Sequence, residues 1–239
     1  MKQVHSPWIN ARYWTAITLA SVFGTNLGDL YAHESGLGII KGLALLALLA
    51  MAVFVVERFD GRRHEVYYWL VIILIRTGAT NIADYLAYVV RVPEAVLTLG
   101  LIVLLVIFGW GTHRLMRKKG VRQNELPPTA TAYWLAMLSA GVFGTVVGDI
   151  FAHAMGEGMA SVVLTIVLLG VLWAGHKRTT QIIAIYWVTV AVARTAGTAI
   201  GDFLAESHVL NIGLPIATLI SGITFVALLI IWRRRAGVT

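Results

Sequence analysis

The sequence YWTAITLASVFGTNLGDLYAH, at residues 13–33, recurs without gaps at residues 133–153 as YWLAMLSAGVFGTVVGDIFAH, with 12 of 21 positions identical. A second pair, YWLVIILIRTGATNIADYLAY at residues 68–88 and YWVTVAVARTAGTAIGDFLAE at residues 186–206, shares 9 of 21 positions. All four segments begin with Tyr-Trp and carry an Asp fifteen residues after the Trp. The chain is therefore built from four related units in the order A-B-A′-B′, and such repetition fixes the architecture.

The composition indicates a protein that lies in a lipid bilayer. Of its 239 residues, 58% are hydrophobic and 13% are charged, whereas about a quarter are charged in soluble domains. Apolar runs at 36–56 and 92–110 reach the roughly 20 residues that cross a bilayer. We therefore expect an all-α membrane protein with eight transmembrane helices, at residues 13–33, 36–56, 67–90, 93–112, 132–154, 158–175, 182–206 and 209–232.

Each unit is one helical hairpin, so it starts and ends on the same side of the membrane. The four units are then parallel, and any pseudo-symmetry axis runs along the membrane normal. The odd-numbered helices carry the four Asp, and polar groups inside membranes face the bundle interior, so we expect odd helices inside and even helices outside. The organisation is a first half at 1–119 with hairpins 13–56 and 67–112, a cytoplasmic linker at 120–131, and a second half at 132–239 with hairpins 132–175 and 182–232.

The net charge of +7 indicates topology rather than nucleic-acid binding. Only Lys41 and Arg91 fall in loops on one side, and Arg76 and Arg194 fall inside helices. The other basic residues share the opposite side: Lys2, Arg12, Arg58, Arg62, Arg63, Arg114, Arg117, Lys118, Lys119, Arg122, Lys177, Arg178, Arg233, Arg234 and Arg235. The positive-inside rule then places both termini in the cytoplasm of a bacterium, with the chain in the inner membrane.

Every unit contains a small-Thr-x-x-small-Asp core. Its members are Thr25 and Asp29, Thr80 and Asp84, Thr145 and Asp149, and Thr198 and Asp202. In a helix the Thr and the Asp lie one turn and about 40° apart, and a rise of about 1.5 Å per residue puts the Asp about 22 Å from the Trp, toward the outer face. The Thr hydroxyl has two candidate partners, a carbonyl of its own helix or the Asp.

The intramembrane charges do not balance. Arg76 and Arg194 stand eight residues before Asp84 and Asp202, so four Asp face two Arg. A charged residue at the bilayer centre costs about 2.5–3.5 kcal/mol, and protons or a bound cation would offset the excess negative charge. We therefore expect a transporter of a small cation, either a divalent metal or a proton-coupled substrate. The alternative is a scaffold or accessory subunit in which the arginines are structural counter-ions.

Two histidines follow an Asp by one turn, at Asp29-His33 and Asp149-His153. Carboxylate and imidazole together suit Mn, Fe, Zn or Ni, and two histidines can also hold a haem; the third interpretation is a pair of interfacial side chains. No Cys is present, which excludes thiolate sites. G-x-S-x-G, P-loop and H-E-x-x-H motifs are absent, and we expect no enzymatic activity and no resident cofactor.

The remaining recurring residues have simple interpretations. Small residues three positions apart favour close helix packing. The four Trp are typical of an aromatic belt at the membrane interface.

The Tyr-Trp pairs and the blocks at 76–84 and 194–202 resemble a bacterial family of uncharacterised membrane-anchored proteins. That family is built from four tandem two-helix repeats of unknown function, each with a characteristic Trp, so the resemblance implies this architecture over residues 13–232. In the family pattern a Glu stands four residues before the Asp, where this chain has Thr. The departure removes four carboxylates and weakens any metal site implied by the resemblance.

Overall fold

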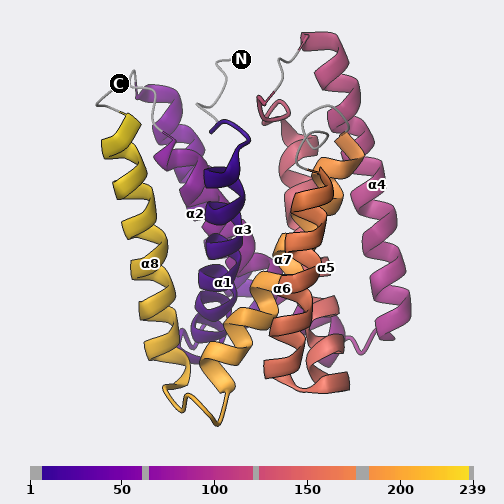
Figure 1. Ribbon diagram of the computed structural model, residues 1–239, viewed down its shortest axis with the longest axis vertical. Coiled ribbons are helices and arrows are strands. Elements are labelled where there is room, and N and C mark those ends of the chain that lie inside the picture. The colour runs from indigo at the N-terminus through magenta and orange to yellow at the C-terminus, as the bar shows by residue number, and fades with distance from the viewer. Residues whose placement is uncertain (1–6, 61–64, 121–123, 176–182, 237–239) are drawn as a thin grey trace.

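A computed structural model of the protein describes residues 7–60, 65–120, 124–175 and 183–236. These segments form long α-helices and one π-helical turn, without a strand among them, which confirms the all-α membrane fold (Figure 1). The elements are α1 (Ala11–Glu34), α2 (Gly38–Phe59), α3 (Val66–Asp84), η1 (Tyr85–Val89), α4 (Glu94–Lys119), α5 (Thr131–Met155), α6 (Glu157–Gly175), α7 (Ile183–Glu206) and α8 (Gly213–Ala236).

Seven of these helices, all except α1, are long and apolar enough to cross a membrane. Helix α1 has 24 residues and therefore a length of about 36 Å. It carries Ser21, Thr25, Asn26 and Asp29 among its apolar residues, and it packs against α3, α7 and α8. Because these neighbours cover it, a lower hydropathy fits its place inside the bundle.

The odd-numbered helices form a closed inner ring. Helices α1, α3, α5 and α7 each pack against two neighbours, so that α1 faces α5 and α3 faces α7 across the ring. Each even helix packs mainly on the next odd one, α2 on α3, α4 on α5, α6 on α7 and α8 on α1, and α4 and α8 lie at opposite edges (Figure 1). Outer helices expose large apolar side chains such as Leu48, Leu99 and Ile166, which is the layering that the polar residues predict.

Helix α1 begins and α8 ends at the same end of the bundle (Figure 1). There the N–H of Ile9 donates to the carbonyl of Asn124 (2.8 Å), and Ile9 and Leu126 are buried in the main core. The described part of the predicted linker, at 124–130, therefore packs at this end of the ring. Of the basic residues used to assign topology, Lys2, Arg62, Arg63, Arg122, Lys177 and Arg178 lie outside the described residues.

The span expected at 67–90 is confirmed by a helix over Val66–Val89, whereas the helices expected at 93–112 and 209–232 instead span Glu94–Lys119 and Gly213–Ala236. The helix expected at 67–90 changes to a π-helical turn after Asp84, where the N–H of Val90 donates to the carbonyl of Tyr85 (2.9 Å). The helix expected at 93–112 continues to Lys119 and stops at Gly120, whose positive φ of 61° suits the left-handed position after a helix. Hydropathy marks the apolar span, whereas the helix itself runs on into polar sequence.

Candidate functional site

Four tyrosine hydroxyls form a closed ring near the end of the bundle where α1 begins. They belong to Tyr13, Tyr68, Tyr133 and Tyr186, which open the four repeats and are all at most 1% exposed. The oxygens of Tyr13 and Tyr186 and those of Tyr68 and Tyr133 are 2.7 Å apart, and the other two sides measure 3.2 and 3.1 Å. Since a hydroxyl both donates and accepts, the four units meet around one hydrogen-bonded axis.

Three of the four tryptophans, Trp14, Trp69 and Trp187, are buried in the bundle and Trp134 is partly buried, so the predicted aromatic belt is wrong. Each indole contacts the tyrosine of the preceding inner helix. The ring centroids are 5.8 Å apart for Trp14 and Tyr186, 6.1 Å for Trp69 and Tyr13, 5.8 Å for Trp134 and Tyr68, and 5.6 Å for Trp187 and Tyr133. Consecutive helical side chains point about 100° apart, so Tyr reaches the axis while Trp fills the gap to the neighbouring helix.

The small residues bring the inner helices together, as their spacing predicts. A Cβ added to Gly24 would lie 2.5 Å from Cγ of Arg76, and one added to Gly144 would lie 2.6 Å from Cβ of Arg194. The same two repeat positions meet at the other two interfaces, in the pairs Gly197 with Ser21 and Ala79 with Gly141. All four interfaces of the ring are thus equivalent, and the arrangement has cyclic pseudo-fourfold symmetry.

A single guanidinium binds the threonines of all four repeats. Arg76 is fully buried. Its Nη1 donates to Thr80 (2.9 Å) and Thr145 (2.8 Å), and its Nη2 donates to Thr25 (2.5 Å) and Thr198 (2.6 Å). Hydrogen bonds to charged groups contribute about 1.5–3 kcal/mol each, so this cluster joins all four inner helices on the axis.

Three of these threonines also bond to their own helices, Thr80 through a long bond to the carbonyl of Arg76 (3.5 Å). The hydroxyl of Thr25 donates to the carbonyl of Ser21 (2.9 Å), and that of Thr198 donates to the carbonyl of Arg194 (3.1 Å). Each therefore donates to a carbonyl and accepts from Arg76. Of the two partners expected from the sequence, the structure shows the carbonyl and, among the described residues, no hydrogen bond between these Thr and the Asp.

Arg194 occupies the equivalent position on α7 and is also fully buried. Its Nη1 donates to Oγ of Ser21 (3.2 Å), its Nη2 lies 3.8 Å from Sδ of Met137, and its Nε has no partner. Met137 is three residues after its Trp and Arg194 is seven after its own, so the side chain points about 6 Å toward the tyrosine ring. Within the described segments, neither intramembrane arginine forms an ion pair with a carboxylate.

The four aspartates Asp29, Asp84, Asp149 and Asp202 are half-buried, one turn beyond the threonines. In the part of the chain that the structure describes, their carboxylates have no ion pair and no hydrogen bond. The four Thr hydroxyls meet on one guanidinium, and each Asp follows about 6 Å further along its helix and about 40° around it. The Asp therefore surround the axis on the side of Arg76 that is away from the tyrosine ring.

The histidines do not join this set. Both His33 and His153 are exposed, on α1 and α5, which face each other across the ring. Nδ1 of His33 lies 2.7 Å from the carbonyl oxygen of Asp29 in its own helix. Among the described residues, no three His, Asp or Glu side chains are grouped so that they could hold one metal ion.

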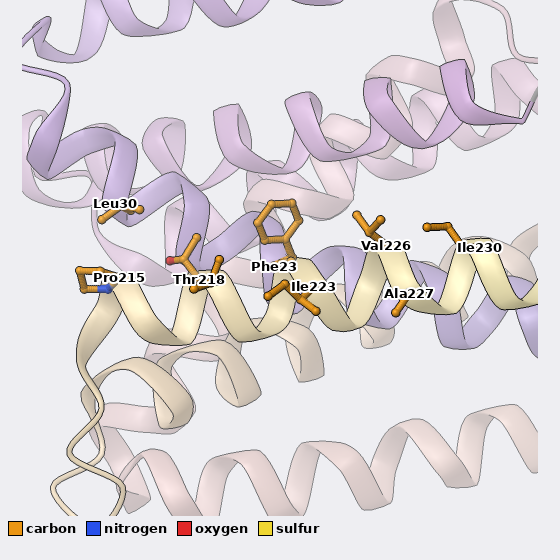
Figure 2. Close-up of a pocket in the computed structure, with 10 residues that line it drawn as sticks. Phe23, Leu30, Pro215, Thr218, Ile223, Val226, Ala227 and Ile230 are labelled. Atoms are coloured by element: carbon orange, nitrogen blue, oxygen red, sulfur yellow. The ribbon is translucent and has the colours of Figure 1, made fainter.

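An apolar groove of about 630 Å³ lies between α1 and α8, on the outside of the inner ring. Figure 2 shows Phe23 of α1 facing Ile223 and Thr218 of α8 along it. None of the lining residues is charged: Phe23, Leu30, Pro215, Thr218, Leu219, Gly222, Ile223, Val226, Ala227 and Ile230. The groove thus lacks the charged groups that an ion site requires, and the axial cluster remains the candidate site.

The tyrosine ring is the part of the axis that the sequence analysis missed. Its signal was the Tyr before each Trp, which recurs as regularly as the Thr and the Asp. The predicted site residues otherwise fall into two groups. The four Thr are in contact with Arg76, and the four Asp follow one turn further along the same helices. Arg194 points away from this group, and the two His are not hydrogen-bonded to it.

The fold and the axial cluster define an all-helical membrane protein built from four hairpins around one axis. The family model of a repeat of unknown function (DUF347) matches residues 12–62, which contain nearly all of α1 and the whole of α2, and residues 185–237, which contain most of α7 and the whole of α8. Two segments of the chain thus match a repeat of this uncharacterised family, which confirms the resemblance seen in the sequence. No curated protein and no solved structure matches the chain.

Proposed function

We propose that the protein is a carrier of a small cation in the bacterial inner membrane, with both termini in the cytoplasm. The four Asp form the binding site, the Thr hydroxyls and Arg76 support it from the inner side, and Arg194 contributes a second buried charge. The observation that carries the proposal is that four unpaired carboxylates surround one axis in the described bundle. We propose no enzymatic activity for this arrangement.

The charges of the inner ring favour a cation over a neutral substrate. If all four Asp are ionised, the two buried Arg leave two negative charges, and bound protons or cations would balance them. A proton is the simplest of these, because a single carboxylate binds it. A divalent metal would need several Asp or His side chains around one point, and the described residues contain no such group.

The order of groups along the axis gives the site a direction. The Asp lie nearest the outer end, Arg76 with its four Thr lies further in, and the tyrosine ring closes the inner end. A cation therefore reaches the carboxylates from outside and is repelled by Arg76. Passage to the cytoplasm requires the Arg76 cluster and the tyrosine ring to open, as expected for a carrier that exposes its site alternately.

Uptake into proteoliposomes tests the proposal. The wild-type protein, with a panel of monovalent and divalent cations and with a pH-sensitive dye for protons, is compared with the Asp29→Asn, Asp84→Asn, Asp149→Asn and Asp202→Asn quadruple variant. Glu94→Gln, which removes an exposed carboxylate at the start of α4, is the matched control. Uptake that is lost in the quadruple variant and kept in Glu94→Gln supports a carrier. Equal uptake by the wild-type protein and the quadruple variant for every cation of the panel contradicts it.

A scaffold or accessory subunit is the second candidate function. It is favoured by a different observation, namely that hydrogen-bonded side chains occupy the axis at two levels. In this case the polar cluster only holds the inner helices together. The quadruple Asp variant would then unfold at a lower temperature in detergent while every flux stayed unchanged.

A further inference from the structure

We propose that Arg194 is the centre of a buried binding site for one small monovalent anion, such as chloride. The site is separate from the four aspartates around the axis, Asp29, Asp84, Asp149 and Asp202 (the Asp ring). It does not depend on whether the protein transports a cation. Its evidence is the set of contacts around two arginines that occupy the same repeat position and differ sharply in how their charge is satisfied.

The Arg194 guanidinium is charged, fully buried and poorly paired. Its side chain is 0% exposed, and its contacts are one hydroxyl at 3.2 Å and one thioether sulfur at 3.8 Å. Thioether sulfur is a weak acceptor, and Nε has no partner at all. A buried charge without a counter-charge or a full set of hydrogen bonds carries a large desolvation cost, so a further acceptor is expected here.

Arg76 is much better paired in the same bundle, although its Nε also lacks a partner. Both of its terminal nitrogens donate to two hydroxyls each, from Thr80, Thr145, Thr25 and Thr198. The guanidinium of Arg76 lies at the level of the four Thr, so the four Asp carboxylates follow about 6 Å further along the axis. Arg194 has neither set of neighbours.

None of the four repeat aspartates can supply the missing negative charge to Arg194. Its guanidinium lies near the level of Met137, twelve residues or about 18 Å along the axis from the Asp level. The tyrosines of the hydroxyl ring lie on that side, since Tyr133 stands one turn, or about 6 Å, before Met137 on the same helix. These phenols are bonded to one another in a ring, so each neutral hydroxyl already has both a donor and an acceptor partner.

The chemistry of the site selects a small, singly charged ligand. One unpaired guanidinium balances one negative charge, and a divalent oxyanion would leave a net charge buried again. A halide accepts N–H groups without a required direction, which suits an Nε and a terminal nitrogen that lack strong partners. The competing source of negative charge is a tyrosinate within the phenol ring, and the experiment separates the two.

Chloride dependence of stability is the test. Protein purified in sodium gluconate is titrated with sodium chloride at constant ionic strength, while thermal unfolding and heats of binding are recorded. A ligand that binds only the folded state raises the unfolding midpoint with its concentration. We expect saturable binding of one chloride, absent in Arg194→Met and retained in the matched variant Arg76→Met, which removes an equally buried charge from the same repeat position.

A second measurement keeps the proposal testable if Arg194→Met fails to fold. Crystals of the wild-type protein grown with bromide should show one anomalous peak in contact with the Arg194 guanidinium. Unfolding that does not depend on chloride, together with tyrosinate absorption in the ultraviolet spectrum at neutral pH, would overturn the proposal in favour of a tyrosinate. Equal loss of chloride binding in both arginine variants would also overturn the assignment to Arg194.

Discussion

Arg76 and Arg194 stand at equivalent positions of α3 and α7, and their side chains point in opposite directions along the axis. Arg76 reaches away from the tyrosine ring to the threonines, while Arg194 reaches toward the tyrosine ring to Met137. Two like charges 4 Å apart repel by about 4 kcal/mol at an effective dielectric constant of 20. Facing each other across the ring, the two guanidiniums avoid this repulsion by occupying different levels, and this is where the twofold relation between the halves breaks down.

Loss of one threonine should destabilise the bundle through Arg76. Thr198→Val removes one of the four hydroxyls around a buried charge, and we expect a loss of about 1.5–3 kcal/mol. The measurement is thermal or denaturant unfolding in detergent, within a double-mutant cycle that combines Thr198→Val with Arg76→Met.

Thr189→Val is the control for this cycle, because the buried Thr189 hydroxyl bonds only to the carbonyl of Ile185 on its own helix (2.7 Å). We expect Thr198 and Arg76 to be strongly coupled and Thr189 and Arg76 to act additively. Additive losses in both cycles would show that the Thr–Arg76 bonds do not form.

Single and multiple changes in the tyrosine ring should differ in a characteristic way. Tyr133→Phe leaves the hydroxyls of Tyr68 and Tyr186 each with one partner fewer, which should cost about 1–3 kcal/mol. Removing all four hydroxyls leaves no unsatisfied hydrogen-bond partner. The loss in free energy of unfolding of the quadruple Tyr→Phe variant should therefore be much smaller than the sum of the losses of the four single variants.

Tyr31→Phe is the control, because it removes a hydrogen bond to the carbonyl of Gly42 (3.1 Å) outside the ring. Its loss in free energy of unfolding should be additive with the loss of any ring variant. If the losses in free energy of unfolding of the four single Tyr→Phe variants added up to that of the quadruple variant, the closed ring of hydrogen bonds would be contradicted.

Glycines at the ring interfaces should not tolerate a methyl group. Gly24→Ala and Gly144→Ala place a Cβ within 2.7 Å of arginine side-chain carbons, and such overpacking typically costs about 1–3 kcal/mol. Gly100→Ala and Gly170→Ala lie in outer helices with nothing within 4 Å and should gain up to about 1 kcal/mol from helix propensity. In unfolding experiments, the first pair of variants should lower the free energy of unfolding and the second pair should raise it. A change of the same sign in both pairs would contradict the packing described.

The tryptophans of the repeats should behave as core residues. Trp69 is 4% exposed and Trp173 is 85% exposed. Trp69→Ala should therefore destabilise by about 3–5 kcal/mol, while Trp173→Ala should change stability little in detergent. An equal, small effect at both positions would restore the aromatic-belt interpretation.

The sequence alone was enough to predict the repeats, the helices and the faces that meet. Helical periodicity places Thr25 and Asp29 on one stripe, and repetition predicts that their counterparts share it. Helical periodicity places Arg76 and Arg194 on the same face of their helices but does not determine the direction in which each long side chain extends. The hydrogen bonds from Arg76 to all four Thr were therefore not predictable. The tyrosine ring was missed for a related reason, because Tyr-Trp at a helix start looks the same whether the pair faces lipid or the core.

The most direct test of the central claim is the initial rate of cation uptake by proteoliposomes that contain each single variant, Asp29→Asn, Asp84→Asn, Asp149→Asn or Asp202→Asn. Because the four carboxylates surround one axis, we expect every single change to lower the rate at equal amounts of folded protein, while Glu94→Gln leaves it unchanged. Wild-type rates in all four variants would contradict the assignment of the Asp ring as the binding site.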